Sequence, residues 1–540
     1  MKRGQIVPRS RRGGALSRRE QGWGARGKRP RERRRRLCLP LDITIVAPGN
    51  NKVIYQELAG SYAAIEPPIW AGLLASGLRN SGYSVRIIDQ EAEGKTSEEI
   101  VRDVSEEPSR MVAVVVYGQQ PSASTQNMTA AQEVCRALKE ENAARPVVIL
   151  GGHPSALPKR TLRETAADFV AQGEGLDTLE GLLGCDRLDD PVKLSRIPGL
   201  WYRSNGEEVF THPAPMIPQR DLSRRLPGIA WDLLPMKAYR AHNWHCFTHI
   251  MERRPYASLY TSLGCPFTCS FCCINAPFEK PALRCWEPEF VIREFEVLAE
   301  RYGVRNIKIA DEMFVLNPHH VLGLCELLIE RDYGFNIWAY ARVDTVQDRF
   351  LEKLEKAGFH WLCLGIESKS QHVRSGVEKD RFHEEDIVPI VRKIQGAGIN
   401  VLGNFIFGLP DEDYDSMQAT FDLAVELNCE WANFYCAMAY PGSALYRYAV
   451  EKGWELPKHW HDFSQHSYEM LPLPTEHVPA GEVIGFRDEA WHLYYTNPSY
   501  LAMVERKFGQ EVLEHLKELT KIRLKRKYLI PPKKGVILTV

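Results

Sequence analysis

Tyr260-Thr-Ser-Leu-Gly-Cys-Pro-Phe-Thr-Cys-Ser-Phe-Cys-Cys273 contains Cys265, Cys269 and Cys272 in the spacing Cys-x3-Cys-x2-Cys, and a β-rich run at 257–263 leads directly into it. Three thiolates on one short loop can ligate three irons of a cubane cluster and leave the fourth iron without a protein ligand. An open iron is a place for chemistry, whereas a site closed by four cysteines is usually structural or carries electrons. The spacing therefore indicates a reactive iron–sulfur cluster.

Two other uses of these cysteines fit the sequence less well. Zinc sites usually pair two Cys-x2-Cys knuckles, or one knuckle with two histidines, and no second knuckle stands at a suitable distance. Disulfides are disfavoured because the remaining cysteines are scattered through a long chain without a secretory signal.

Length and composition indicate a globular protein of two or three domains. The chain has 540 residues, of which 44% are hydrophobic and 26% charged. No run of about eighteen apolar residues occurs, so we expect no membrane span and a cytoplasmic location.

The zero formal charge hides a basic first segment. Residues 1–36 carry 15 Lys and Arg against 2 Asp and Glu, and they lack apolar periodicity. We therefore expect residues 1–40 to be a disordered tail. A nucleic-acid arm, a targeting peptide and translation from a misassigned start codon are the alternatives. The abrupt start of an apolar run at Leu41 favours the last, and we assign the tail no function and expect no nucleic-acid partner.

Residues 41–185 alternate short apolar runs with amphipathic stretches. This pattern predicts strands at 43–47, 85–88, 111–116, 147–150 and 169–171, with helices at 69–81, 97–104, 124–140 and 178–183. Because the strands are β-branched and nearly continuous, we expect a doubly wound, Rossmann-like α/β domain. Such sheets bind ligands beyond the carboxyl ends of their strands.

The same alternation returns after the cysteine loop, in residues 251–445. It predicts helices at 288–302, 320–332, 349–356, 387–397 and 416–427, with strands at 306–309, 337–341, 361–364, 400–407 and 431–438. With the strand before the cysteines, these make six βα units, which is a partial (β/α)6 barrel of the TIM type. A parallel barrel collects its strand ends on one catalytic rim.

The regions outside these two domains leave alternatives open. In the junction at 186–250, the segment Tyr239-Arg-Ala-His-Asn-Trp-His245 could line an active site or plug the domain junction. Residues 446–540 form an extension that is helical and rich in Trp and Tyr, and it is predicted to end in a basic helix at 508–527. Its aromatic residues are better explained by packing than by a ligand cage, although the extension could cap the open side of the barrel and help select the substrate.

The cysteine triplet and the rim resemble those of radical S-adenosylmethionine (SAM) enzymes. The resemblance implies that Cys265, Cys269 and Cys272 hold a 4Fe-4S cluster, and that one electron from it cleaves SAM to methionine and a 5′-deoxyadenosyl radical. It also implies SAM contacts at Phe271, Asp311 or Glu312, Arg342, Glu367, Gly403 and Gly408. From the residues alone, Arg342 could equally form a salt bridge within the rim.

Residues 41–185 resemble the cobalamin-binding domain that precedes many radical SAM barrels. Gly151-Gly-His-Pro-Ser155, followed about twenty residues later by Gly173-Glu-Gly175, carries the resemblance together with the loop 117–124. It implies that cobalamin is bound by Gln119, Gln120, Ser122, Ser124, Gly151, Gly152, His153, Ser155, Gly173, Glu174 and Gly175.

One motif of that family is missing. The motif Asp-x-His-x-x-Gly, whose His ligates cobalt, would need Asp at Gly151 and Gly at Ala156. We therefore expect His153 to pack or hydrogen-bond at the strand end and not to ligate cobalt. The lower face of cobalamin would then meet Gln119, Gln120 or Pro121.

The combined resemblance implies a methyltransferase. One SAM methylates cobalamin, a second SAM yields the radical that removes a hydrogen from an unactivated carbon, and that carbon takes the methyl group from methylcobalamin. The expected partners are a small-molecule or biosynthetic-intermediate substrate and an external one-electron reductant of flavodoxin or ferredoxin type. A cyclisation or rearrangement with the same cofactors is one alternative. A non-catalytic cobalamin-binding sensor is another, and the intact cysteine triplet counts against it.

Overall fold

The computed structural model describes residues 40–118, 121–278 and 280–531. The predicted tail at residues 1–40 lies outside the described residues except for Pro40. Gln119 and Gln120, two of the predicted cobalamin contacts, also lie outside them.

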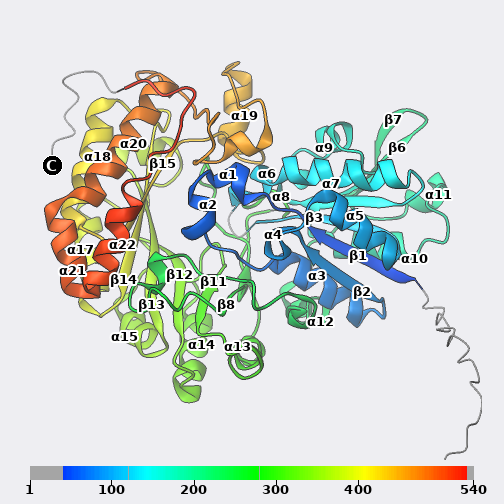
Figure 1. The fold of residues 1–540 in the computed structure, drawn as a ribbon, viewed down its shortest axis with the longest axis horizontal. Coiled ribbons are helices and arrows are strands. Elements are labelled where there is room, and N and C mark those ends of the chain that lie inside the picture. The colour runs from blue at the N-terminus through cyan, green and yellow to red at the C-terminus, as the bar shows by residue number, and fades with distance from the viewer. Residues whose placement is uncertain (1–39, 119–120, 279, 532–540) are drawn as a thin grey trace, which may run out of the picture. The chain divides into compact units, whose positions relative to one another are not determined.

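The first sheet has seven strands in the order β2-β1-β3-β4-β5-β6-β7 (Figure 1). The strands are β1 (Leu41–Ala47), β2 (Val85–Asp89), β3 (Ser109–Val116), β4 (Val147–Gly151), β5 (Phe169–Ala171), β6 (Leu200–Ser204) and β7 (Glu207–Phe210). β1 to β5 pair in parallel, whereas β6 and β7 are added antiparallel to the edge. The predicted Rossmann-like sheet is confirmed, and two strands from the expected junction make it mixed.

Helices cover both faces of this sheet (Figure 1). The helices of this part of the chain are α1 (Asn51–Tyr55), α2 (Leu58–Ser61), α3 (Ile69–Asn80), α4 (Gln90–Glu93), α5 (Ser97–Glu106), α6 (Pro121–Gln126), α7 (Met128–Glu141), α8 (Gly152–Ala156), α9 (Pro158–Glu164), α10 (Leu176–Gly184), α11 (Pro191–Leu194) and α12 (Leu222–Arg225). The single helix predicted at 124–140 was wrong. The chain forms α6 and α7 instead, with Asn127 between them, and the Ser124 hydroxyl of α6 donates to the Val116 carbonyl at the end of β3.

The second sheet has six parallel strands in the order β15-β14-β13-β12-β11-β8. They are β8 (Tyr256–Leu259), β11 (Asn306–Ile309), β12 (Asn336–Arg342), β13 (Phe359–Glu367), β14 (Asn400–Phe407) and β15 (Trp431–Cys436). The helices between them are α13 (Pro288–Tyr302), α14 (Pro318–Arg331), α15 (Asp348–Lys356), α16 (Gln371–Gly376), α17 (Glu384–Gly396) and α18 (Tyr414–Leu427). The six predicted βα units are confirmed, and the barrel is open because β8 and β15 do not pair with each other.

The strand predicted at 257–263 is two strands in the structure. β8 ends at Leu259, and β9 (Ser262–Leu263) then pairs antiparallel with β10 (Arg284–Cys285). The cysteine loop lies between β9 and β10, so this short ladder closes the loop at its base.

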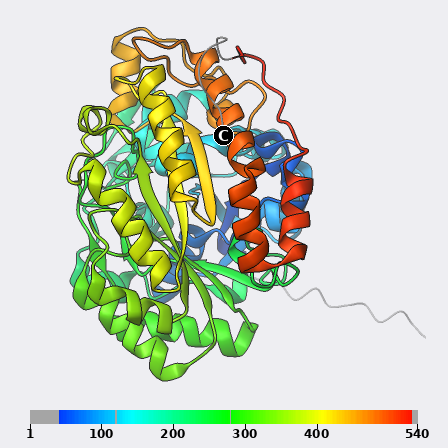
Figure 2. The same ribbon diagram turned by 90° about the vertical axis from the view of Figure 1, so that its left-hand side faces the viewer.

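The C-terminal helices lie beside β15 (Figure 2). They follow α19 (Ala444–Glu451) and are α20 (Ala480–Thr496), α21 (Pro498–Phe508) and α22 (Gln510–Leu519). The basic helix predicted at 508–527 was wrong, because Gly509 takes a φ of 87° between α21 and α22, and regular structure ends at Leu519. None of the helices in the described ranges has the length and apolarity that a membrane crossing needs.

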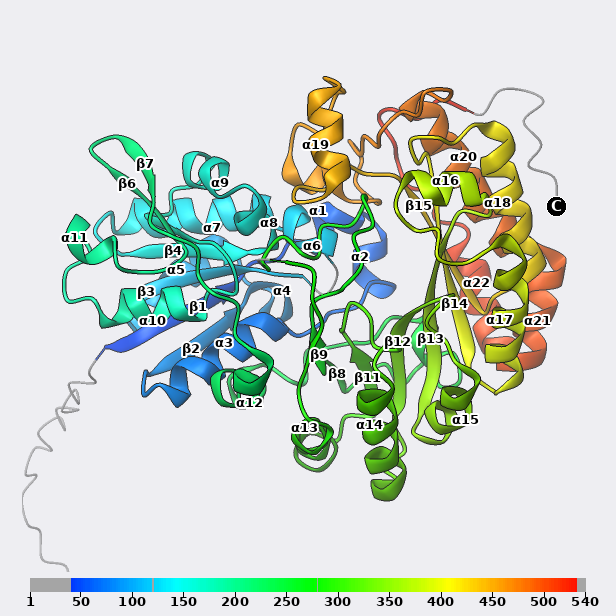
Figure 3. The same cartoon turned by 180° about the vertical axis from the view of Figure 1, so that it is seen from behind.

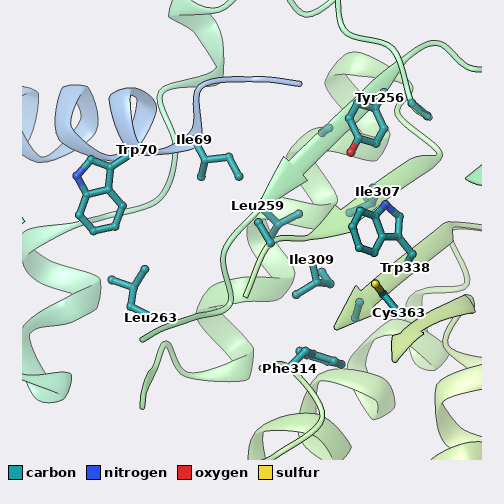
Figure 4. Close-up of a cluster of buried hydrophobic side chains, with 14 of the residues drawn as sticks. Ile69, Trp70, Tyr256, Leu259, Leu263, Ile307, Ile309, Phe314, Trp338 and Cys363 are labelled. Carbon is teal, nitrogen blue, oxygen red and sulfur yellow. The ribbon is translucent and has the colours of Figure 1, made fainter. Parts of the chain in front are cut away.

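One hydrophobic core runs through both sheets. Figure 4 shows Ile69 and Trp70 of α3 together with Leu259 and Leu263 from the barrel side, and all four belong to the same buried cluster. A buried ion pair also joins the two parts, since Arg284 Nη2 of β10 lies 2.8 Å from Glu174 Oε1 in the loop after β5. The two sheets are therefore parts of one packed unit.

Gly151 offers a test of the first sheet. Its φ is 147°, and an added Cβ would lie 2.0 Å from the Val116 carbonyl oxygen. We expect Gly151→Ala to introduce more than about 2 kcal/mol of strain and to lower the thermal midpoint followed by circular dichroism by about 2 °C or more. Gly60→Ala is the control, because an added Cβ there meets nothing within 4 Å. Equal midpoints for the two variants would contradict the described turn.

Candidate active site

A cavity of about 790 Å³ is lined by residues from both sheets. Tyr117, Ser122 and Gly152 line it from the loops that follow β3 and β4, and the cysteine loop lines it from the barrel side. Figure 3 shows α1, α2, α6 and α8 between the two sheets. Because the carboxyl ends of parallel strands share one edge, the loops of each sheet reach the cavity together.

The three cysteines of the triplet all line this cavity. Cys265 is buried, and Cys269 and Cys272 are half-buried. The loop is fixed by hydrogen bonds from Ser270 N to the Val377 carbonyl (3.1 Å) and from Leu445 N to the Ser270 carbonyl (2.8 Å). These two hydrogen bonds hold the cysteine loop against Val377 and Leu445.

The three thiols do not form a site for a single metal ion in the described part of the chain. Among the described residues, no three His, Cys, Asp or Glu side chains converge on a position for a single metal ion. A zinc site needs such convergence, whereas a cubane binds each thiolate at a different iron and keeps the sulfur atoms apart. Three thiolates on one cavity wall can each ligate a different iron of a 4Fe-4S cluster.

The two acidic residues after β11, Asp311 and Glu312, have different surroundings. Asp311 is fully buried and accepts hydrogen bonds of 2.6 Å from Thr261 N, Thr261 Oγ1 and Ser262 Oγ, so it holds the chain that leads to the cysteines. Glu312 lines the cavity and accepts from Gly264 N at 3.0 Å. Burial raises the pKa of Asp311 to about 6 and that of Glu312 to about 8. Glu312 is thus the acid that can meet a ligand.

Arg342 faces both a carboxylate and a cysteine. Its Nε donates to Asp344 Oδ1 at 2.8 Å and its Nη2 to Asp344 Oδ2 at 3.2 Å. Its Nη1 donates to Cys269 Sγ at 3.4 Å, and its guanidinium lies 3.9 Å from the centre of the Phe267 ring. Arg342 therefore forms the salt bridge that the sequence left as an alternative, and it contacts the cysteine loop directly.

Glu367 lies at the cavity wall in a buried ion pair. It contacts Lys379 Nζ, and the two side chains are 8% and 5% exposed. Glu367 has a φ of 65°, where the register between β13 and β14 shifts. Lys379, which the sequence analysis did not single out, therefore fixes the direction of the predicted ribose contact.

The other predicted SAM contacts divide between the wall and the core. Phe271 lines the cavity. A Cβ on Gly403 would lie 2.9 Å from the Phe405 ring, and one on Gly408 would lie 2.7 Å from Val483 Cγ1 of α20. Both glycines lie outside the cavity wall and are needed for close packing.

The predicted cobalamin contacts divide in the same way. Three of them line the cavity, namely Ser122, Ser124 and Gly152. The other described ones are not part of its wall, namely Gly151, His153, Ser155, Gly173, Glu174 and Gly175. Gly173 N donates to Ser155 Oγ at 3.0 Å, and His153 N donates to Ser124 Oγ at 2.8 Å.

His153 is packed at the strand end. It is 2% exposed, its Nδ1 shares a hydrogen bond of 3.2 Å with Thr125 Oγ1, and its ring lies 4.4 Å from that of Trp460. Burial lowers the pKa of His153 to about 3, so the ring is neutral. These contacts match the expectation that it packs and hydrogen-bonds.

Tyr117 is a further polar residue at this edge of the first sheet. Its ring lines the cavity and stacks on Trp70 at 4.6 Å, and its buried hydroxyl has no partner among the described residues. A buried hydroxyl without a partner is costly, so a ligand with polar groups fits this wall.

Comparison with known proteins identifies the family. Residues 56–183 match the family described as B12 binding domain, and residues 259–424 match the Radical SAM superfamily. The chain belongs to the cobalamin-dependent radical SAM family. It is 29% identical over 436 residues to an uncharacterized methyltransferase of Pyrococcus horikoshii, spanning 81% of this chain and 89% of that protein.

Two further likenesses extend over most of the chain. The anaerobic magnesium-protoporphyrin IX monomethyl ester cyclase of Rubrivivax gelatinosus is 25% identical over 449 residues, spanning 82% of this chain and 76% of that protein. The solved structure of the radical SAM methyltransferase TsrM from Kitasatospora setae, with cobalamin and a [4Fe-4S] cluster bound, superposes with a TM-score of 0.59 at 20% identity. It covers 77% of this chain and 75% of that one, and this likeness shows the fold.

Several cavity residues of this family member were missed from the sequence. Glu66 lies 3.2 Å from Lys308 Nζ, accepts from Ser258 Oγ at 3.2 Å and lies 3.4 Å from His242 Nε2. Burial alone would raise the pKa of Glu66, but the charge on Lys308 and the contact with His242 lower it to about 2. Glu66 stands in a Pro-flanked loop without periodicity, so no local signal marked it.

An amide pair on the barrel wall was also missed. Asn433 Nδ2 donates to Asn404 Oδ1 at 3.0 Å, and Asn404 Nδ2 donates to Cys363 Sγ at 3.0 Å. Both asparagines line the cavity from neighbouring strands at one level of the sheet. The alternation of strand residues could have indicated them, because an inward-facing Asn in a buried parallel strand is unusual.

The segment 239–245 of the junction has side chains of both expected kinds, since some line the cavity and His245 is buried. His242, Asn243 and Trp244 line the cavity, whereas His245 is buried and its Nε2 lies 2.9 Å from the Asn336 carbonyl. The first three residues can therefore meet a ligand, and His245 plugs the space beneath the barrel.

Arg342 leads to a test that does not depend on turnover. Hydrogen bonds and positive charge near a cluster sulfur raise the reduction potential of the cluster. We therefore expect Arg342→Gln to shift the potential of the reconstituted cluster to a more negative value, measured by a redox titration followed by electron paramagnetic resonance. Arg381→Gln is the control, because Arg381 lies over the same Phe267 ring at 4.9 Å without a contact to Cys269. Equal potentials for Arg342→Gln and the wild type would contradict this role.

Proposed function

We propose that this radical SAM enzyme is a methyltransferase that transfers a methyl group to an unactivated carbon of a small molecule. The supporting observation is that the three cysteines and the strand-end loops of the B12-binding domain line one cavity. A methyl donor and a radical generator must reach the same carbon, and a shared cavity permits this.

When bound, the cluster and SAM supply a 5′-deoxyadenosyl radical, and cobalamin supplies the methyl group. Cys265, Cys269 and Cys272 would hold the cluster, and Glu312 and Glu367 would orient SAM from the cavity wall. Ser122, Ser124 and Gly152 would meet cobalamin at the opposite edge. Asp311 and Arg342 would keep the cysteine loop in place and exclude water from its inner side.

The relatives favour methylation over the other candidate reaction. The P. horikoshii protein and TsrM are both named methyltransferases. The R. gelatinosus relative is a cyclase, so a cyclisation with the same cofactors is the second candidate function. The electron would come from a flavodoxin- or ferredoxin-type reductant.

We also propose the following division of the chain. Residues 41–185 would be the cobalamin-binding domain, 186–250 the junction, 251–445 the radical SAM barrel and 446–540 the C-terminal extension. β6 and β7 show that the junction contributes strands to the first sheet.

Cys269→Ala tests the cluster assignment. After anaerobic reconstitution with iron, sulfide and hydroxocobalamin, we expect the wild type to release 5′-deoxyadenosine from SAM under reducing conditions. Cys269→Ala should lose the cluster absorbance and this product, because an iron ligand is missing. Cys185→Ala is the matched control, since Cys185 is half-exposed and outside the cavity wall. Cluster absorbance that persists in Cys269→Ala would show that the ligand assignment is wrong.

SAM with a labelled methyl group separates the two reactions. A methyltransferase forms S-adenosylhomocysteine in a cobalamin-dependent way, in addition to 5′-deoxyadenosine. If 5′-deoxyadenosine forms and S-adenosylhomocysteine does not, methylation is contradicted and the cyclisation is favoured.

A further inference from the structure

Four polar side chains gather on the cavity wall at the end of β15, where the C-terminal extension packs. They come from α1, β15, the segment before α20, and α20 itself, and all four line the cavity: Tyr55, Tyr435, His466 and Arg487. We call this group the donor corner. None of its members was expected from the sequence to serve a ligand, and the function proposed above does not use them.

Arg487 is fixed so that one edge of its guanidinium faces the cavity. Its Nε donates to the Phe434 carbonyl of β15 at 2.7 Å, and its Nη1 donates to Asp488 Oδ1 at 2.7 Å. Its Nη2 has no hydrogen-bond partner among the described residues. The residue is 7% exposed and lines the cavity, so this nitrogen is free to donate to a group that occupies the cavity.

The charges at the donor corner are unbalanced. Asp488 is shared, because Arg526 Nε donates to Asp488 Oδ2 at 3.0 Å and Arg526 Nη2 donates to Oδ1 at 3.1 Å. The Arg526 side chain is 1% exposed. Two buried guanidinium groups therefore contact one carboxylate. The carboxylates of Glu66 and Glu91 act on Tyr55, so the excess of positive charge is confined to the surroundings of Asp488. Buried charges in proteins are normally paired, so the second guanidinium at Asp488 favours an anion in the cavity beside Arg487.

The other members of the corner supply hydrogen-bonding groups. The hydroxyls of Tyr55 and Tyr435 have no hydrogen-bond partner among the described residues, and neither has the ring of His466, which lies 5.2 Å from the ring of Tyr55. Burial raises the pKa of both tyrosines, that of Tyr55 to about 12, so both hydroxyls keep their protons. Burial, together with the charges of Arg487 and Arg526, lowers the pKa of His466 to about 3, so its ring is neutral and has one N–H.

We propose that the donor corner binds an oxyanion, a carboxylate or a phosphate, that is carried by the substrate. Arg487 Nη2 and the two phenol hydroxyls would donate to it, and charge-assisted hydrogen bonds of this kind are the strong ones. Trp431 and Trp491 line the cavity from β15 and α20, so the rest of the ligand would meet aromatic surface. The inference rests on the proposed function in one respect only, namely that a substrate occupies this cavity.

The position of the corner favours the substrate over the cofactors. The predicted SAM contacts that reach the cavity lie in the cysteine loop and at the ends of β11 to β13, and the predicted cobalamin contacts follow β3 and β4. The donor corner is built mainly from β15 and the extension, on the side where the barrel is open. Cobalamin and SAM also carry oxyanions, however, so the test distinguishes all three sources.

Phenyl phosphate and phenol are the probes, because they share a ring and differ in the phosphate. In protein loaded with cluster, cobalamin and SAM, we expect calorimetry to show phenyl phosphate binding that weakens about tenfold in Tyr435→Phe and is lost in Arg487→Gln. Tyr435→Phe removes a hydroxyl without a described protein partner, so it should fold normally. Phenol binding should not change in either variant.

Arg523→Gln is the matched control. Arg523 also lines the cavity, but its side chain is 56% exposed and lies 4.0 Å from Glu489. Its replacement should alter phenyl phosphate binding by less than about twofold, because exposed charges are screened by water.

Three results would overturn the inference. Unchanged phenyl phosphate binding in Tyr435→Phe and Arg487→Gln would show that the corner does not bind the oxyanion. Less cobalamin bound per chain in the variants would assign the corner to the cobalamin phosphate, and weaker SAM binding would assign it to the SAM carboxylate. The two proposals can fail separately. If phenyl phosphate binds and its binding depends on Arg487, but no methyl transfer occurs, the proposed function is contradicted and the donor corner is supported.

Discussion

Parallel pairing of strands is the constraint on which the site depends. In each sheet it brings the carboxyl ends of the strands to one edge, and both edges contribute to the same cavity. The order β2-β1-β3-β4-β5 places the loop after β3 at the point where the direction of the strand order reverses. The open barrel contributes because β8 and β15 leave a side that the C-terminal helices cover. A closed barrel of eight strands would have no such side.

Buried ion pairs fix how the loops of the first domain meet the barrel. Glu174 pairs with Arg284 of β10, and Glu66 pairs with Lys308 of β11. Desolvation offsets much of the attraction in such pairs, so they add little net stability, but an unpaired partner would be strongly unfavourable. We infer that the two pairs select one arrangement of the domains around the cavity. Both carboxylates come from loops of the first part of the chain, and both cations come from strands on the barrel side.

Sequence patterns were sufficient for the strands and insufficient for the side chains. The strands at 169–171, 306–309 and 400–407 were predicted with the bounds that the structure shows, because each is an apolar run between turn residues. Ser155 and Glu174 stay predicted cobalamin contacts, and the structure shows both of them bonded to other parts of the protein, namely to Gly173 and Arg284. A loop residue that holds another loop and one that holds a ligand have the same local sequence signal. Only the tertiary neighbours distinguish them.

The C-terminal extension shows the same limit of sequence patterns. Its aromatic residues were interpreted as packing, and Tyr494, Tyr495 and Tyr500 are indeed buried. Arg487 stands in the same helix and turns into the cavity, where only β15 and the segment around Arg526 define its role. A charged residue inside a helix is ordinary in a sequence, and its burial becomes visible only when the helix packs. The helix predicted at 508–527 failed for a related reason, since the amide of its last residue, Lys527, instead donates to the Tyr468 carbonyl.

We propose that the cluster and the cobalamin face one cavity in this chain. Electron paramagnetic resonance of protein that holds both cob(II)alamin and the reduced cluster tests it directly, because nearby paramagnetic centres alter the relaxation of each other. If both centres face the cavity, each signal relaxes faster in the doubly loaded protein than in protein loaded with that centre alone. A doubly loaded spectrum that equals the sum of the two single spectra would contradict it.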